Sequence, residues 1–170
     1  EIRLSLVGSE MCIRDRYSNQ KRPLLIADLK EDVLDEILKK LQIEHIKLHI
    51  HCTGYVPNSD LPYLYNGAYI FLYTSLRESF GIPILEAMAC GTPVITSNTS
   101  SMPEIAGEQA ILVNPYKEEN IMEKLLLLES DTHLYQQQVI YGLQRIKTFS
   151  WENTAKKLLS IYSSLSKEQA

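Results

Sequence analysis

The residues best suited to chemistry lie between positions 74 and 98, in the stretch TSLRESFGIPILEAMACGTPVITSN. Two carboxylates, Glu78 and Glu86, flank Gly81 there. A glycine lets the backbone approach a ligand closely, and a helix that starts beside it presents unpaired N–H groups and the positive end of its dipole to an anion. This turn is therefore predicted to bind a phosphate or a diphosphate.

The spacing of the two carboxylates indicates what else such a ligand carries. Glu78 precedes the predicted helix and Glu86 lies within its first turns, so the two would reach opposite ends of one ligand. Carboxylates accept paired hydrogen bonds from vicinal hydroxyls, which suits sugar-like groups on either side of the phosphates. A nucleotide-sugar meets that description. Taken alone, the pair is explained better as two solvated carboxylates that stabilise the helix dipole, and the surrounding motif reverses that preference.

The elements that must position these residues alternate between strand and helix. From Pro23 onward, short apolar runs rich in β-branched residues alternate with helical patterns, which is typical of β–α units wound into a parallel sheet. The predicted strands cover residues 23–28, 46–54, 69–73, 93–96 and 110–115. The predicted helices cover residues 31–42, 59–68 with Ser59 or Asp60 as cap, 81–91, 117–129, 132–147 and 152–165. The fold class is thus α/β, a Rossmann-like parallel sheet flanked by helices, with a helical C-terminal tail and a ligand site at the carboxyl end of the third strand.

Composition and charge exclude several classes of function. The 170 residues, 45% hydrophobic and 22% charged, fit one soluble domain. A formal net charge of -4 offers no general attraction to polyanions, so nucleic acid is not an expected partner. No apolar run reaches the roughly 20 residues that cross a bilayer, and no secretory signal is visible. Three cysteines without a CxxC pair, Cys12, Cys52 and Cys90, suit a reducing compartment, so we expect a cytoplasmic location.

Two further groups have both a functional and a structural interpretation. His49 and His51 lie on one face of a predicted strand with Cys52 on the other, a spacing that could ligate zinc with a third ligand. Histidines on a strand that enters a core are more often packed or exposed, so the structural interpretation is favoured. Glu104 is expected to cap or favour the start of a short helix rather than to bind substrate.

Several stretches resemble the retaining glycosyltransferases of the GT-B fold, family 4 type (glycosyl transferases group 1), in their C-terminal donor-binding domain. The E-x7-E motif of that family appears as ESFGIPILE and is followed by EAMACGTPVI and SSMPEIAGEQAILVNP. The likeness extends upstream to CTGYVPNSDLPYLYNGAYIFLYTSLRE and downstream to FSWENTAKKLLSIY, roughly from Pro23 to Leu165.

The resemblance implies an activity and a set of site residues. The activity is transfer of a hexose from a nucleotide-sugar donor to an acceptor hydroxyl with retention of configuration, in which the leaving diphosphate assists the acceptor. Glu78 would be the catalytic residue and contact hydroxyls of the hexose, and Glu86 would hold the ribose. The rest of the donor site would be Ser79, Phe80, Gly81 and Ile82 at the sugar and diphosphate, and Gly54, Tyr55 and Val56 beside the base. No Asp-x-Asp motif is visible, and neither a metal nor another cofactor is expected.

The resemblance also implies parts that this sequence does not contain. Family members carry an Arg and Lys pair at the diphosphate and an N-terminal domain that binds the acceptor, here a glycan or a lipid-linked sugar; no counterpart precedes Pro23. Residues 17–170 would then be a donor-binding domain truncated at its N-terminus and inactive alone, and the resemblance allows for peripheral association of the full enzyme with a membrane. Phe149 and Trp151 would anchor the last helices, although the final helix often packs towards the other domain, and an exposed apolar strip would fit truncation.

The first residues raise a separate hypothesis. SLVGSEMCIRDR resembles the translation of a transposase-type sequencing adapter, which makes residues 1–16 a predicted non-native leader. By pattern alone, IRLSLVG also fits the first strand of a Rossmann-type sheet.

Two rival functions stay open at this point. A GT-B sugar-nucleotide epimerase would share the architecture, although its pattern is not seen around the carboxylate pair. A non-catalytic nucleotide-binding Rossmann-like domain would form a self-sufficient sheet without a partner domain.

Overall fold

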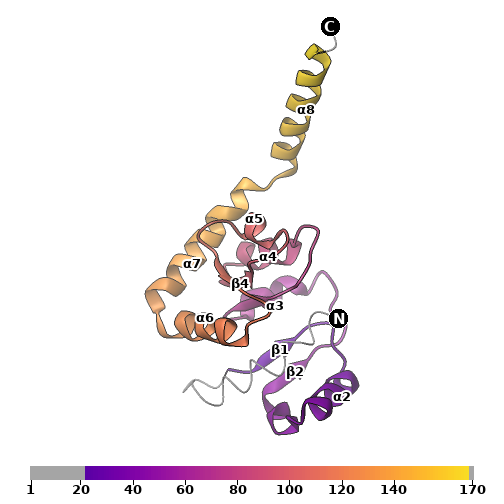
Figure 1. Ribbon diagram of the computed structural model, residues 1–170, viewed down its shortest axis with the longest axis vertical. Coiled ribbons are helices and arrows are strands. Elements are labelled where there is room, and N and C mark those ends of the chain that lie inside the picture. Colours follow the sequence, from indigo (N-terminus) through magenta and orange to yellow (C-terminus); the bar gives the residue numbers. More distant parts are fainter. Residues whose placement is uncertain (1–21, 169–170) are drawn as a thin grey trace.

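The computed structural model describes residues 22–168 and has an α/β architecture (Figure 1). Its strands are β1 (Leu24–Ile26), β2 (Ile50–Cys52), β3 (Phe71–Tyr73), β4 (Val94–Ser97) and β5 (Ile111–Val113). β1 pairs with β2, and β4 lies between β3 and β5, all in parallel. The predicted fold class is confirmed, but within residues 22–168 the strands form two ladders instead of one. The predicted leader, residues 1–16, and the alternative first strand within it lie outside the described residues.

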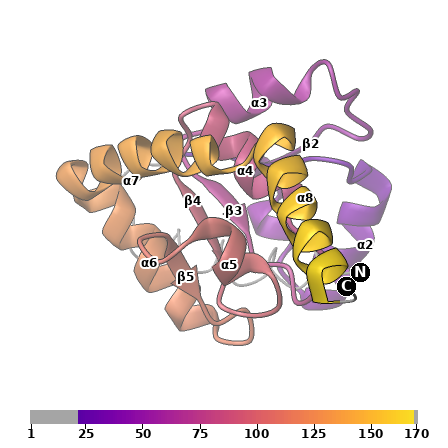
Figure 2. The same ribbon diagram turned by 90° about the horizontal axis from the view of Figure 1, so that it is seen from above.

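The three-stranded ladder is covered by helices on both faces. Alternate strand residues point to opposite faces: Phe71, Tyr73 and Val94 face one core, and Ile95 and Ile111 face another. The first core is closed by α3 (Leu61–Gly67), α4 (Ile82–Ala89) and α5 (Met102–Ala106), and the second by α6 (Glu118–Ser130). Figure 2 shows β3 and β4 between α4 and α6. Such a doubly covered sheet holds the ends of its strands rigidly.

The two-stranded ladder has a core of its own, formed with α2 (Glu31–Leu41). Leu34 and Leu38 of α2 are buried there with Ile46 and Ile50. The predicted strand over residues 46–54 is wrong in its first half, because residues 44–49 form a 3-10 helix, η2 (Glu44–His49). Alternating apolar residues predicted a strand, but Leu48 is 87% exposed while Ile46 is fully buried, as in a turn of helix.

The predicted cap of α3 is also not formed. Asp60 occupies the N-cap position in an αR conformation and its side chain makes no capping hydrogen bond. Instead, the Ser59 hydroxyl donates to Asp60 Oδ1 at 2.9 Å. Pro62 lies in the first turn of this helix, where its missing N–H removes one of the donors that a cap would satisfy.

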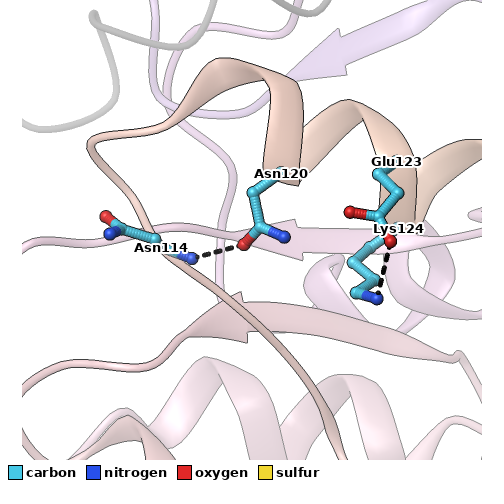
Figure 3. A network of polar contacts seen from close by, with 4 residues as sticks. All are labelled: Asn114, Asn120, Glu123 and Lys124. Carbon is cyan, nitrogen blue, oxygen red and sulfur yellow. Dashed lines mark hydrogen bonds and ion pairs between the residues drawn. The ribbon is translucent and has the colours of Figure 1, made fainter.

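A polar connection fixes the end of β5 to α6 (Figure 3). The backbone N–H of Asn114 donates to Asn120 Oδ1 at 2.9 Å, and Asn114 Oδ1 accepts from the N–H of Tyr116 at the same distance. One turn further along α6, Lys124 pairs with Glu123, and this pair lowers the pKa of the Glu123 carboxyl. The asparagine pair sets the direction of the chain between β5 and α6, whereas the exposed ion pair adds little to the stability of the fold.

The chain ends in α7 (Thr132–Arg145), a short 3-10 turn η3 (Ile146–Thr148) and α8 (Trp151–Glu168). Phe149 packs edge-on against Phe80 with ring centroids 6.1 Å apart, so its predicted anchoring role is confirmed. The same prediction is wrong for Trp151, which is 90% exposed. α8 extends away from the body of the molecule (Figure 1). Of its exposed apolar residues, Trp151, Leu158, Tyr162 and Leu165 are spaced for one helical face, and Leu159 and Ile161 are exposed beside them.

Among residues 22–168, no helix is both long and apolar enough to pass through a bilayer.

The junction of α5 and α7 yields a stability prediction. Gly107 ends α5 with φ +86°, and a Cβ there would collide with the Tyr141 hydroxyl, which itself donates to the Ala106 carbonyl at 2.9 Å. Gly107→Ala is therefore expected to lower the free energy of unfolding by about 2 kcal/mol. The matched control is Gly67→Ala, because Gly67 has an ordinary φ and open space around its Cβ position. Chemical denaturation of both variants tests this, and equal midpoints would contradict it.

Candidate functional site

The turn between β3 and α4 presents a run of free backbone donors. Gly81 is the N-cap of α4 with φ 97° and ψ 46°, a left-handed conformation that favours glycine. In the described part of the chain, the N–H groups of four consecutive residues, Ser79, Phe80, Gly81 and Ile82, donate to no protein acceptor. The N–H of Ile84 is already used by the Gly81 carbonyl, and Pro83 has none. The donors available to an anion are therefore the four in the turn.

Glu78 is positioned by two residues at and just after the end of β3. The Tyr73 hydroxyl at the end of β3 donates to Glu78 Oε1 at 2.5 Å, and Ser75 Oγ lies 3.2 Å from the same oxygen. Tyr73 is the last residue of β3, and Ser75 lies two residues beyond it in the loop that leads to Glu78. The carboxylate is partly buried and its Oε2 accepts no hydrogen bond from the described residues.

Glu86 is positioned by the neighbouring helix. It lies on α4, and its Oε2 accepts a hydrogen bond of 3.0 Å from the hydroxyl of Tyr65, a residue of α3 that is 8% exposed. The carbonyl of Tyr65 accepts in turn from Thr92 Oγ1 at 2.5 Å, which ties α3 to the turn that follows α4. Glu78 therefore lies in the loop before α4 and Glu86 in the second turn of α4, and each carboxylate is held by a tyrosine hydroxyl.

A run of hydroxyl residues at the end of β4 and just after it fastens the backbone of the Glu78 loop. Ser100 Oγ accepts from the Glu78 N–H at 3.2 Å and donates to the Glu78 carbonyl at 2.8 Å. We call residues 96–101, TSNTSS, the hydroxyl latch. Its donors and carbonyl acceptors are Thr96 to Tyr73, Ser97 to Ser75, Thr99 to Leu76, Ser100 to Glu78, and Ser101 to Glu78 and Phe80. The latch fixes the loop before any ligand arrives.

An open cleft of about 480 Å³ lies over this loop and is lined by Arg77, Glu78, Ser79 and Ser100. Arg77 is exposed and is the cationic member of this lining. The cleft has a positive side chain and backbone donors beside a carboxylate, a combination that suits a ligand with both phosphate and hydroxyl groups.

The predicted base-binding loop follows the other ladder. Gly54 has φ 62°, and its carbonyl accepts from the N–H of Asp28 at 2.9 Å while its N–H donates to Leu29 at 3.0 Å. Tyr55 is 82% exposed. The loop Gly54-Tyr55-Val56 is thus anchored to the turn after β1, at the carboxyl end of a different ladder from Glu78.

The zinc interpretation of the His49 region gains no support. Among residues 22–168, no three His, Cys, Asp or Glu side chains converge where they could hold a metal ion. His49 ends η2 whereas His51 and Cys52 lie on β2, and burial raises the pKa of the Cys52 thiol, which disfavours a thiolate ligand. Glu104 lies in the first turn of α5, as predicted.

Sequence reasoning missed the residues that support the two carboxylates. These are Tyr65, Tyr73, Ser75 and Ser100, and the exposed Arg77 of the cleft lining was missed as well. The available signals were Tyr73 and Ser75, at and just past the end of one strand, and the run TSNTSS, which begins in the last residues of the next strand. The segments that leave neighbouring parallel strands lie side by side.

Comparison with known proteins places the chain in a family. Residues 12–145 match the family described as glycosyl transferases group 1. The chain is 36% identical over 151 residues to O-antigen chain mannosyltransferase B of Escherichia coli, an alignment that spans 87% of this chain but 39% of that protein.

Solved structures share the fold. The C-terminal domain of a glycosyl transferase group 1 family protein (LpcC) from Francisella tularensis matches with a TM-score of 0.67 and 24% identity, over 85% of this chain and 77% of that one. Anabaena HepE in complex with UDP and glucose matches with a TM-score of 0.73 and 19% identity, over 93% of this chain and 44% of that one. The resemblance and the GT-B-type fold predicted from sequence are confirmed. The chain belongs to the glycosyl transferases group 1, a family of glycosyltransferases.

Proposed function

We propose that the chain is the donor-binding part of an enzyme that transfers a hexose from a nucleotide-diphosphate sugar to an acceptor hydroxyl with retention of configuration. The observation that carries this proposal is a run of four free N–H groups between Glu78 and α4, the helix that carries Glu86, with each carboxylate held by a tyrosine hydroxyl. The family membership supports the reaction class, and the UDP and glucose named for the Anabaena structure support the ligand class.

Each part of the donor has a place in this proposal. The N–H groups of residues 79–82 bind the diphosphate, Glu78 orients hydroxyls of the hexose and Glu86 binds the ribose. The loop Gly54-Tyr55-Val56 borders the base. Because backbone donors and the end of α4 meet the diphosphate charge, the proposal includes no metal ion and no other cofactor.

The reaction then proceeds by charge stabilisation and positioning. The bond between the anomeric carbon and the diphosphate oxygen breaks, and the anomeric carbon bonds to the acceptor oxygen on the same face of the sugar. The departing diphosphate oxygen takes the proton of the acceptor hydroxyl. Negative charge grows on the diphosphate during this step, where donors already fixed by the latch stabilise it without reorganisation.

The acceptor belongs to another part of a longer protein. The chain spans 39% of the length of the Escherichia coli relative, so we propose that a further domain binds a glycan or lipid-linked sugar and that residues 17–170 alone bind donor weakly and transfer little. The name of that relative supports a role in polysaccharide biosynthesis. The free thiols of Cys52 and Cys90 support a cytoplasmic location.

The first prediction concerns the two carboxylates. Glu78→Gln and Glu86→Gln should each weaken binding of a nucleotide-diphosphate sugar about tenfold, because each removes a charged acceptor for ligand hydroxyls. UDP-glucose and GDP-mannose are titrated against the chain and followed by ligand-observed NMR, which detects weak binding.

The matched control is Glu123→Gln, since Glu123 is exposed on α6 and its carboxylate interacts with Lys124 and Asn120 of the same helix. It should bind as the wild type does. Binding of neither donor by the wild type, or equal affinities for all the variants, would count against the proposed function.

A second prediction concerns the hydroxyl latch. Ser100 has φ 56°, and Ser100→Ala removes both hydrogen bonds to the Glu78 backbone while keeping that unfavourable conformation. It should cost about 1 kcal/mol of unfolding free energy and weaken donor binding. Ser100→Gly should be less destabilised, because glycine adopts this φ readily. Ser130→Ala, which removes a local helical hydrogen bond on α6, serves as control; donor affinities equal to that control would refute a role for the latch.

A further inference from the structure

Each carboxylate of the site is held at one oxygen and open at the other. Tyr73 and Ser75 both contact Oε1 of Glu78, and Tyr65 contacts Oε2 of Glu86. Among the described residues, nothing hydrogen-bonds to the second oxygen of either carboxylate. A side chain held in this way presents a single oriented acceptor, whereas a free glutamate would sample several rotamers.

The two tyrosines are well placed to hold this geometry. Tyr65 is buried and Tyr73 is half-buried at the end of β3, so neither ring is free to rotate away. Hydrogen bonds from a hydroxyl to a carboxylate are short and strong, and the Tyr73 to Glu78 distance of 2.5 Å belongs to that class. The two carboxylates are therefore already ordered, so ligand binding costs little further side-chain entropy at these positions.

One aromatic ring connects the two anchors. Phe71 lies edge-on to Tyr65 with centroids 5.1 Å apart, and it stacks with Tyr73 at 5.8 Å with an interplanar angle of 18°. All three rings pack in the core between β3 and the helices α3 and α4. The row Tyr65-Phe71-Tyr73 thus runs beneath the site and ends in one hydroxyl for each carboxylate.

We propose that Tyr73 and Tyr65 are positioning residues that divide the donor between them. Tyr73 acts through Glu78 on the hexose, and Tyr65 acts through Glu86 on the ribose, while Phe71 sets the spacing of the two anchors. This inference rests on the proposed function, and it assigns each half of the donor to one tyrosine hydroxyl.

The experiment compares a nucleotide-diphosphate sugar with the nucleoside diphosphate alone. UDP-glucose with UDP, and GDP-mannose with GDP, are titrated against Tyr73→Phe and Tyr65→Phe in the chain as it stands. Tyr73→Phe should lower the affinity for the sugar nucleotide about fivefold to tenfold and leave the affinity for the nucleoside diphosphate unchanged, because only the hexose contact is lost. Tyr65→Phe should lower the affinity for both ligands by a similar factor, because both contain the ribose.

Two controls separate positioning from a general structural effect. Tyr135→Phe removes a hydroxyl that donates to the Tyr69 carbonyl at 3.1 Å, at the other end of β3, and it should change neither affinity. In a Glu78→Gln background, Tyr73→Phe should have little additional effect, since the tyrosine acts through that carboxylate. If Tyr73→Phe does not fold, Ser75→Ala removes the second contact to Oε1 and should show the same preference for the sugar nucleotide.

The outcomes distinguish this inference from the proposed function. Failure of the wild type to bind either donor overturns both. Loss of binding in Glu78→Gln and Glu86→Gln with wild-type affinities in both tyrosine variants overturns only the assignment of the tyrosines. The assignment is also overturned if Tyr73→Phe lowers the affinity for both ligands equally. The same holds if its effect is undiminished in the Glu78→Gln background.

Discussion

The geometry of the site depends on how the backbone of Glu78 is held. Ser100 Oγ binds both the N–H and the carbonyl of this residue, and Ser101 adds a second donor to the same carbonyl. The N–H and the carbonyl of Glu78 are thus hydrogen-bonded to the neighbouring loop. The N–H groups of the next four residues, 79–82, have no acceptor among the described residues. Unpaired donors are costly unless water or a ligand meets them, which makes this turn the natural place for an anion.

That arrangement follows from the sheet. β3 and β4 pair in parallel with Tyr73 opposite Thr96, so the segments that leave their carboxyl ends run side by side. The latch residues reach the Glu78 loop because of this register. The helices on both faces keep the strands from shifting, and the core beneath the site supplies the two tyrosine hydroxyls. β3 therefore serves both the core and the site, because Tyr73 packs in the core and its hydroxyl holds Glu78.

Much of this could be predicted from the sequence, and the exceptions have physical causes. The order of strands and helices was predicted from local patterns, and so was the position of Glu78 before, and Glu86 within, the helix that begins after Gly81. η2 was missed because its apolar residues alternate as in a strand, and only tertiary packing exposes Leu48. The tyrosine anchors were missed because the contact of Tyr65 with Glu86 joins residues that are 21 positions apart on different helices.

The proposed function requires the turn from Ser79 to Ile82 to bind the diphosphate of a nucleotide-sugar. Backbone amide NMR tests it most directly, by titration of the 15N-labelled chain with UDP-glucose and GDP-mannose. We expect one of these donors to shift the amide signals of residues 79–82 most strongly and together, with smaller shifts at Glu86 and Tyr55. Shifts confined to other parts of the chain, or unchanged signals at residues 79–82 on saturation with a bound donor, would contradict it.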